Sequence, residues 1–123
     1  MPKTALISIV DDDEAMRMAL KGLMRSLGYA AEAFASAEGF ISSRHLHRTA
    51  CLIVDVNMPG MSGPKLHEHL VNTGTPIPTI LITAYPNEEV RSRALSAGVA
   101  GYFTKPFDDN VFLECIRSAL KTS

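Results

Sequence analysis

Polar side chains follow four apolar runs of the sequence, and their types suit the chemistry of phosphoryl groups. In chain order they are Asp11 and Asp12, Asp55, Thr83 and Lys105. Carboxylates in close contact repel one another and need a cation, and an all-oxygen ligand set favours Mg²⁺, with Mn²⁺ as a substitute. A carboxylate can attack phosphorus, while a lysine and a hydroxyl can pair with phosphoryl oxygens. The sequence therefore predicts a metal-assisted phosphoryl site, provided that the fold brings these residues together.

The apolar runs predict five strands, because they are short, rich in β-branched residues and bounded by charged or turn-forming residues. The expected strands cover residues 5–10, 29–34, 51–54, 79–83 and 99–103. Between and after them, apolar residues recur at helical spacing beside capping residues. The expected helices cover residues 15–27, a segment that begins after Ser36 and ends within 42–49, residues 64–72, residues 86–95, and a last segment capped by Asp108 or Asp109. Their buried sides are expected to carry Leu66, Leu70 and Val71 in the third helix, and Val111, Phe112, Ile116 and Leu120 in the last.

Strands that alternate with helices imply a parallel sheet, because each crossover connection carries a helix back over the sheet. We therefore expect an α/β fold with five parallel strands and five helices on both faces, in the flavodoxin-like strand order 2-1-3-4-5. In that order the carboxyl ends of strands one, three, four and five lie on one rim, where ligands bind in open parallel sheets. An isolated aspartate usually caps a turn. The convergence of five polar residues on one rim favours a functional site instead.

Length and composition fit a single domain that spans residues 1–123, since 46% hydrophobic and 20% charged residues are ordinary for a globular chain. The formal net charge of -1 gives no reason to expect direct nucleic-acid binding. No apolar run has the length of a bilayer span or of a leader peptide's core. Cys51 and Cys115 lie in apolar contexts and are expected to be buried thiols in a reducing compartment. We expect a cytoplasmic protein that does not bind membranes.

Four motifs span almost the whole chain: V-D-D-D at 10–13, V-D-V-N-M-P-G-M-S-G at 54–63, L-I-T-A at 81–84 and Y-F-T-K-P-F at 102–107. Their order and spacing resemble those of the receiver domain of two-component response regulators. The resemblance implies that Asp55 is the phosphoacceptor and that Asp12 and Asp55 bind Mg²⁺ directly. The backbone carbonyl of Asn57 would be a further ligand, and Asp11 would act through metal-bound water.

The same resemblance implies a switch at the rim. Thr83 would be the switch hydroxyl, Lys105 the phosphate-sensing cation and Tyr102 the switch aromatic residue. The Lys105-Pro106 peptide bond is expected to be cis, which proline's tertiary amide permits. The domain would catalyse its own phosphorylation and slow dephosphorylation, without being a dedicated metabolic enzyme.

The implied partners follow from the same family. A sensor histidine kinase or a histidine phosphotransfer protein would supply the phosphoryl group. Phosphorylation would change the surface of the fourth helix, fifth strand and fifth helix, which would control a downstream protein or an output domain, or form a homodimer. The loop M-P-G-M-S-G and the ending K-P-F look most like receivers that precede a helix-turn-helix domain of the nitrogen-fixation regulator type. The chain could equally be a complete single-domain regulator.

Three other classes were compared with this interpretation. A dedicated Mg²⁺-dependent phosphatase with an aspartyl-phosphate intermediate would carry a second acid two residues after its nucleophile, where this sequence has Asn57. A pseudo-receiver would lack site residues, and all five are present. A flavin-binding flavodoxin would carry a Ser/Thr/Gly-rich phosphate loop after the first strand. The receiver interpretation therefore explains more of the sequence than any of these.

The remaining residues with chemical potential are given structural roles. Asp13 and Glu14 extend the acidic run and are expected to lie in the first turn of the next helix, where negative charge is favourable. Four histidines lie in or near expected helices, at 45, 47, 67 and 69, and their i,i+2 spacing does not place a pair on one helix face. We therefore do not expect them to bind metal or to relay phosphate.

Overall fold

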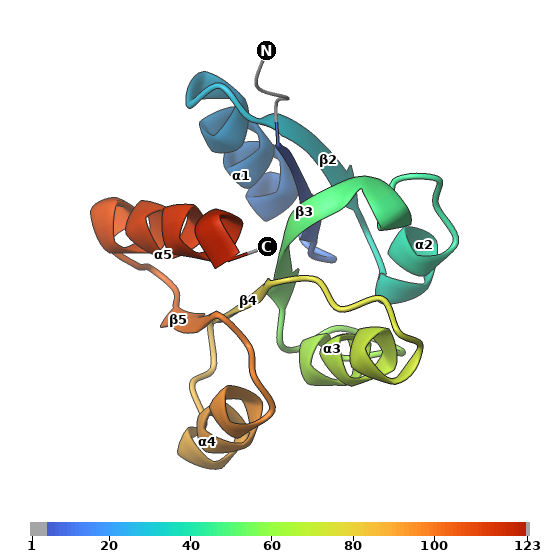
Figure 1. Ribbon diagram of the computed structural model, residues 1–123. Helices are drawn as coiled ribbons and strands as arrows, with labels where there is room; N and C mark the ends of the chain where they lie inside the picture. Colours follow the sequence, from blue (N-terminus) through green and yellow to red (C-terminus); the bar gives the residue numbers. More distant parts are fainter. Residues whose placement is uncertain (1–4, 123) are drawn as a thin grey trace.

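The computed structural model of the chain describes residues 5–122, without the side chain of residue 122, so residues 1–4 and 123 of the expected domain lie outside it. Five parallel strands form one sheet in the order β2-β1-β3-β4-β5, which confirms the expected order (Figure 1). The strands are β1 (Leu6–Val10), β2 (Ala30–Phe34), β3 (Thr49–Asp55), β4 (Thr79–Thr83) and β5 (Gly101–Thr104). β3 therefore begins at Thr49 rather than Cys51, and β5 at Gly101 rather than Val99.

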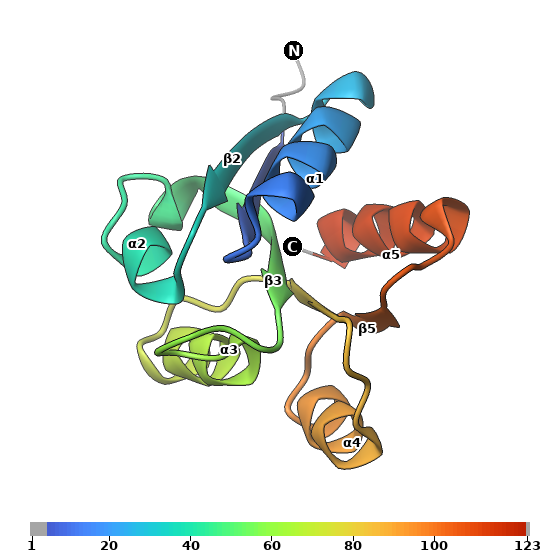
Figure 2. The ribbon, with the colours of Figure 1, turned by 180° about the vertical axis from the view of Figure 1, so that it is seen from behind.

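Helices cover both faces of the sheet, as Figures 1 and 2 show from opposite sides. They are α1 (Glu14–Ser26), α2 (Ala37–Ile41), α3 (Gly63–Asn72), α4 (Glu88–Ser96) and α5 (Asp109–Thr122), with a short 3-10 helix η1 (Leu46–Arg48) before β3. Successive side chains of a strand point to opposite faces. Leu52 and Val54 of β3 thus join the core under α2, α3 and α4, whereas Ile53 joins the core under α1 and α5. Because both faces are covered, the central strands are mostly apolar, and the buried hydroxyl of Ser8 in β1 is hydrogen-bonded to that of Thr49.

Capping residues fix where the helices begin, largely where the sequence predicted. The side chains of Ser36 and Asn87 accept hydrogen bonds from the backbone N–H groups of Gly39 and Val90. Asp108, rather than Asp109, caps α5, because its carboxylate accepts from the backbone N–H of Val111 at 3.1 Å. Such caps satisfy backbone donors that have no partner within the helix.

Asp13 is also a cap. Its carboxylate accepts a hydrogen bond from the backbone N–H of Ala15 at 3.0 Å, so it is the N-cap of α1 rather than an acid of the first turn. Glu14 occupies the first turn as predicted. The acidic run therefore contributes two residues to starting the helix and leaves Asp11 and Asp12 for the rim.

Three burial predictions are wrong. Val71 of α3 is 51% exposed and Val111 of α5 is 57% exposed. Val71 follows Leu70 and Val111 precedes Phe112, and both Leu70 and Phe112 face the sheet. Adjacent residues of a helix point about 100° apart, so the two valines point away from the sheet. Cys51 is buried as expected, but Cys115 is only partly buried because it lies at the edge of the α5 contact with β5.

Candidate functional site

The carboxyl ends of β1, β3, β4 and β5 meet at one rim, as the strand order requires. A cavity of about 290 Å³ opens at this rim, which we call the rim cavity. It is lined by Asp11, Asp12, Asp13, Asp55, Asn57, Ala84, Tyr85 and Lys105. Thr83 is fully buried beside the cavity, and Tyr102 lies outside it. The structure therefore brings together the acids and the lysine that the sequence singled out.

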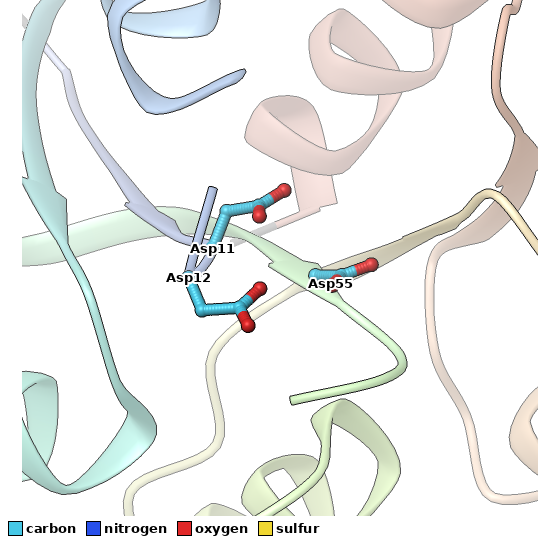
Figure 3. Close-up of side chains that lie close together, drawn as sticks. All are labelled: Asp11, Asp12 and Asp55. Atoms are coloured by element: carbon cyan, nitrogen blue, oxygen red, sulfur yellow. The ribbon is translucent and has the colours of Figure 1, made fainter. Parts of the chain in front are cut away.

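Three carboxylates converge within the rim cavity. Asp11 and Asp12 follow β1, Asp55 ends β3, and one oxygen from each lies within 4.8 Å of the other two (Figure 3). Asp11 is fully buried, Asp55 is 7% exposed and Asp12 is exposed, so the group is closed toward the sheet and open toward solvent. A set of carboxylate oxygens with one open side suits a hard cation that keeps some of its waters. These residues therefore fit Mg²⁺.

Lys105 supplies the positive charge of the site. Its ammonium nitrogen lies 3.2 Å from Asp11 Oδ2 and 3.6 Å from Asp55 Oδ1. The backbone N–H of Lys105 donates to the carbonyl oxygen of Thr83 at 2.8 Å, which fixes the lysine beyond the end of β5. The peptide bond between Lys105 and Pro106 is cis, the isomer expected from the sequence. A mostly buried lysine in this position can also form an ion pair with an additional anion, such as a phosphoryl group.

The carboxyl group of Asp55 has a raised pKa. Burial raises its pKa, and the negative charges of Asp11 and, less strongly, Asp12 raise it further, while Lys105 lowers it. The resulting pKa is about 6. Desolvation and like charges both disfavour the ionised form. A cation beside Asp55 would favour the carboxylate and so restore its nucleophilic form at neutral pH.

Thr83 and Asn57 form a link that the sequence did not predict. The side-chain amide of Asn57 donates to Thr83 Oγ1 at 3.1 Å, and the backbone N–H of Tyr85 donates to the same oxygen at 3.0 Å. The Thr83 hydroxyl hydrogen stays available as a donor. Asn57 was predicted to contribute its backbone carbonyl. Its side chain makes a different contact, with Thr83 of the neighbouring strand.

The turn between β3 and α3 passes close to Asp55 because it contains Gly63. A Cβ atom at Gly63 would lie 2.6 Å from the carbonyl oxygen of Asp55, closer than backbone atoms tolerate. The N–H of Gly63 donates to the carbonyl oxygen of Val56 at 3.1 Å. The Glu38 carboxylate of α2 accepts a hydrogen bond from the N–H of Met61 in the same turn at 3.2 Å. The sequence predicted neither the close approach of Gly63 to Asp55 nor the contact of Glu38 with Met61.

Tyr102 of β5 connects to the start of α4. Its hydroxyl oxygen accepts a hydrogen bond from the backbone N–H of Asn87 at 3.2 Å, and its ring packs against the core under α4. Thr83 and Tyr102 lie on the neighbouring strands β4 and β5. Thr83 is hydrogen-bonded to Asn57 at the rim, and Tyr102 is hydrogen-bonded to Asn87 just before α4. This arrangement gives a physical connection between the rim cavity and the surface of α4 and β5.

A parallel 2-1-3-4-5 sheet with three acids and a lysine at its carboxyl rim defines a receiver-like class of protein. The family model "response regulator receiver domain" matches residues 7–117, and the chain belongs to this family. The response regulator TodT of Pseudomonas putida is 40% identical over 119 residues, which are 97% of this chain and 52% of TodT.

Solved structures agree with this assignment. The response regulator StyR superposes with a TM-score of 0.89 and 35% identity, over 98% of this chain and 61% of that one. The crystal structure of FixJ-N superposes with a TM-score of 0.87 and 31% identity, over 99% of this chain and 98% of that one. The chain thus spans about half the length of TodT. None of the helices in residues 5–122 is long and apolar enough to cross a bilayer.

Proposed function

We propose that Asp55 accepts a phosphoryl group from a phosphohistidine and that the domain catalyses this transfer itself. The observation that carries the proposal is the position of Asp55. It is a nearly buried carboxylate that shares the Lys105 ammonium with Asp11 and lies within 4.8 Å of two other acids. This combination suits in-line attack on a phosphoryl group better than a structural role, because like charges so close together destabilise the fold when no cation compensates them.

In the proposed reaction, a carboxylate oxygen of Asp55 attacks phosphorus and the phosphorus–nitrogen bond of the phosphohistidine breaks. The imidazole of the donor leaves with the bonding electron pair. Lys105 pairs with the phosphoryl oxygens, since its ammonium already lies 3.6 Å from Asp55. Asp11, Asp12, Asp55 and the carbonyl of Asn57 would hold Mg²⁺, which supplies charge neutralisation at the phosphoryl oxygens.

Hydrolysis of the resulting acyl phosphate returns the domain to its starting state. A dedicated phosphatase would need a general acid two residues after the nucleophile. Asn57 occupies that position, and its amide is bonded to Thr83. An amide does not titrate near neutral pH, so dephosphorylation is proposed to be slow.

The phosphoryl group would act on the rest of the domain through Thr83 and Tyr102. New negative charge attracts the Thr83 hydroxyl, which would exchange its present partners for a phosphoryl oxygen. Tyr102 would then move toward the vacated space and release the N–H of Asn87 at the start of α4. Phosphorylation shifts the population only by as much as it favours the altered state. The surface that changes is that of α4, β5 and α5.

The proposed partners are a sensor histidine kinase or a histidine phosphotransfer protein as donor. The altered surface would bind an attached output domain or a downstream protein. Alternatively, it would mediate phosphorylation-dependent homodimerisation. The described residues contain no basic recognition helix, and the net charge of -1 supports the proposal that any DNA binding resides in another domain.

Intact mass after incubation with acetyl phosphate, with and without Mg²⁺, tests the proposal. We expect one Mg²⁺-dependent, hydroxylamine-labile phosphoryl group on the native chain and none on Asp55→Asn. Asp109→Asn, an exposed acid in the first turn of α5, is the matched control and should be labelled normally. Labelling of Asp55→Asn, or failure of the native chain to accept phosphate from both acetyl phosphate and a histidine kinase, would contradict it.

A further inference from the structure

A second hollow of the described structure lies between α3 and α4. We call it the α3–α4 groove. Its volume is about 540 Å³, within the range of pockets that hold small molecules. Figures 1 and 2 show the two helices as neighbours on the same face of the sheet. The proposed phosphoryl transfer uses none of the side chains of these helices.

Both helices present a regular stripe of residues to the groove. From α3 the lining includes Pro64, His67, Glu68 and Val71, and from α4 it includes Val90, Arg93, Ala94 and Ala97. Each set follows the i, i+3, i+4, i+7 spacing of one helix face. The exposure of Val71, which contradicted the sequence prediction, results from this second stripe. Most of the lining area is apolar, yet the described structure puts no side chain across it.

His67 is the polar feature of the groove that points to a ligand. It is 7% exposed, and neither ring nitrogen has a hydrogen-bond partner among residues 5–121. Burial lowers its pKa, so the imidazole is neutral at physiological pH and carries one N–H donor and one acceptor. The His67 ring nitrogens are not among the fully buried polar atoms that lack a partner, so they reach the surface of the groove that His67 lines. The imidazole can therefore form a hydrogen bond with a group that enters the groove.

The charged residues that line the groove indicate which kind of ligand group it would bind. Two cations, Lys65 and Arg93, and one acid, Glu68, line it. Arg93 is already paired with Glu89 at 2.8 Å, whereas Lys65 has no ion-pair partner among the described residues. Lys65 and His67 are two positions apart on α3 and do not share a helix face, so the exposed Lys65 ammonium would attract an anion to the groove while the N–H of His67 donates to it. Anions are stabilised by such charge-assisted hydrogen bonds.

We propose that the α3–α4 groove binds a small, largely apolar molecule that carries one carboxylate. Apolar walls of valine and alanine accommodate its body, the N–H of His67 donates to its carboxylate, and the exposed Lys65 attracts that carboxylate by charge.

The position of Asn57 couples this site to the rim cavity. Asn57 lines both hollows, and its amide is hydrogen-bonded to Thr83. A ligand that contacts Asn57 would alter the hydrogen bond to the switch hydroxyl, and phosphorylation would alter affinity for the ligand by the same factor. This coupling rests on the proposed function of Asp55, whereas the binding site itself does not.

Binding is tested on the unphosphorylated chain by backbone amide NMR, with cyclohexanecarboxylate as the probe. Cyclohexanecarboxamide has the same shape without the charge, and acetate has the charge without the apolar body. We expect saturable shifts of amides along α3 and α4 with the carboxylate, binding about threefold to tenfold weaker with the carboxamide, and none with acetate. Equal binding of the carboxylate and the carboxamide, or no saturable shift with either, would overturn the proposal.

Variants locate the site. Ala97→Met fills the groove from its exposed edge and should abolish binding, whereas Ala19→Met, at an exposed position of α1, should not. His67→Leu should weaken carboxylate binding about threefold to tenfold. Because His67 is buried, Lys65→Gln at an exposed position provides a second test and should weaken it about twofold to fivefold. Unchanged affinity in Ala97→Met would overturn the proposal.

Asp55→Asn separates the two proposals. We expect this variant to bind cyclohexanecarboxylate with unchanged affinity although it cannot accept phosphate. If the native chain accepts phosphate but no probe binds, only the groove proposal fails. If the probe binds and Asp55 cannot be phosphorylated, only the proposed function and the coupling fail.

Discussion

The rim cavity and the α3–α4 groove differ in how the fold builds them. The rim cavity is the smaller, about 290 Å³ against about 540 Å³, and its charged residues follow strands of a buried sheet. The groove lies between two helices that contact the sheet separately, and only Ala94 of α4 is buried. The sheet therefore fixes the positions of the rim acids. The width of the groove depends instead on the position of α4 relative to α3. The charged residues of the rim cavity thus lie at the ends of buried strands. The apolar groove lies beside α4, the α-helix with the fewest buried residues among those described.

Lys105→Ala should show the largest functional effect, because it removes the cation shared by Asp11 and Asp55. We expect initial phosphorylation by acetyl phosphate to slow by about 100-fold, which corresponds to about 3 kcal/mol. Intact mass against time measures the rate. Ala97→Met in the groove should leave the rate within about twofold. An equal loss of phosphorylation rate in both variants would mean that the rim cavity and the groove do not act independently.

The two sides of α3 should differ in their contribution to stability. Leu70→Ala removes a buried side chain and should lower the free energy of unfolding by about 2–5 kcal/mol. Val71→Ala, at the adjacent exposed position, should change it by less than about 0.5 kcal/mol. Urea denaturation of both variants measures the difference. A large loss in Val71→Ala would show that the groove is closed in solution.

Asp55→Asn should stabilise the domain at neutral pH when Mg²⁺ is absent. The folded-state pKa of about 6 lies above the ordinary aspartate value of 3.8, so the folded state binds the proton more tightly than the unfolded state does. Stability therefore falls as pH rises from about 4 to about 6, and the penalty is complete above that window. We expect Asp55→Asn to gain about 1–3 kcal/mol at pH 7.5 and little below pH 4.

Denaturation at a series of pH values checks this window, with Asp109→Asn as control. Added Mg²⁺ should stabilise the native chain and reduce the advantage of the variant, because it compensates the same charges. A gain that is independent of pH would assign the effect to something other than the ionisation of Asp55.

Thr83→Val should have a small effect on stability and should test the role of Asn57. Valine keeps the buried volume but removes the oxygen that accepts from Asn57 and Tyr85, at a cost of about 1 kcal/mol. The variant should still accept phosphate at Asp55, but the NMR signals of the Tyr102 ring should no longer respond to phosphorylation. A full response of Tyr102 in this variant would refute the switch assignment.

Sequence periodicity predicted the elements well where both faces of a strand are buried. β1 is apolar except for the buried Ser8, and β4 is apolar between Thr79 and Thr83. Strands that are covered on both sides have this largely apolar pattern. The prediction was weaker for α3 and α5. Helical spacing tells which residues share a face, but not how wide the buried stripe is, so Val71 and Val111 were assigned to the wrong side.

The candidate site divides in the same way. Asp11, Asp12, Asp55 and Lys105 could be singled out because each lies at or just beyond the end of an apolar run, and strand ends converge in a parallel sheet. The contact of Asn57 with Thr83 joins residues 26 positions apart, and the contact of Glu38 with Met61 joins residues 23 apart. No local pattern encodes such pairs, since they depend on the register between neighbouring strands and on the path of a turn.

The sequence by itself determined the strand ends, the chemistry of the rim and the family, because these follow from residue type and local spacing. Only the tertiary structure decided that the pKa of Asp55 is raised to about 6, that His67 is buried without a partner and that α3 and α4 enclose a groove. The physical reason is that burial, like-charge proximity and the space between helices are properties of segments distant in the chain. They arise only when the whole sheet and its helices pack together.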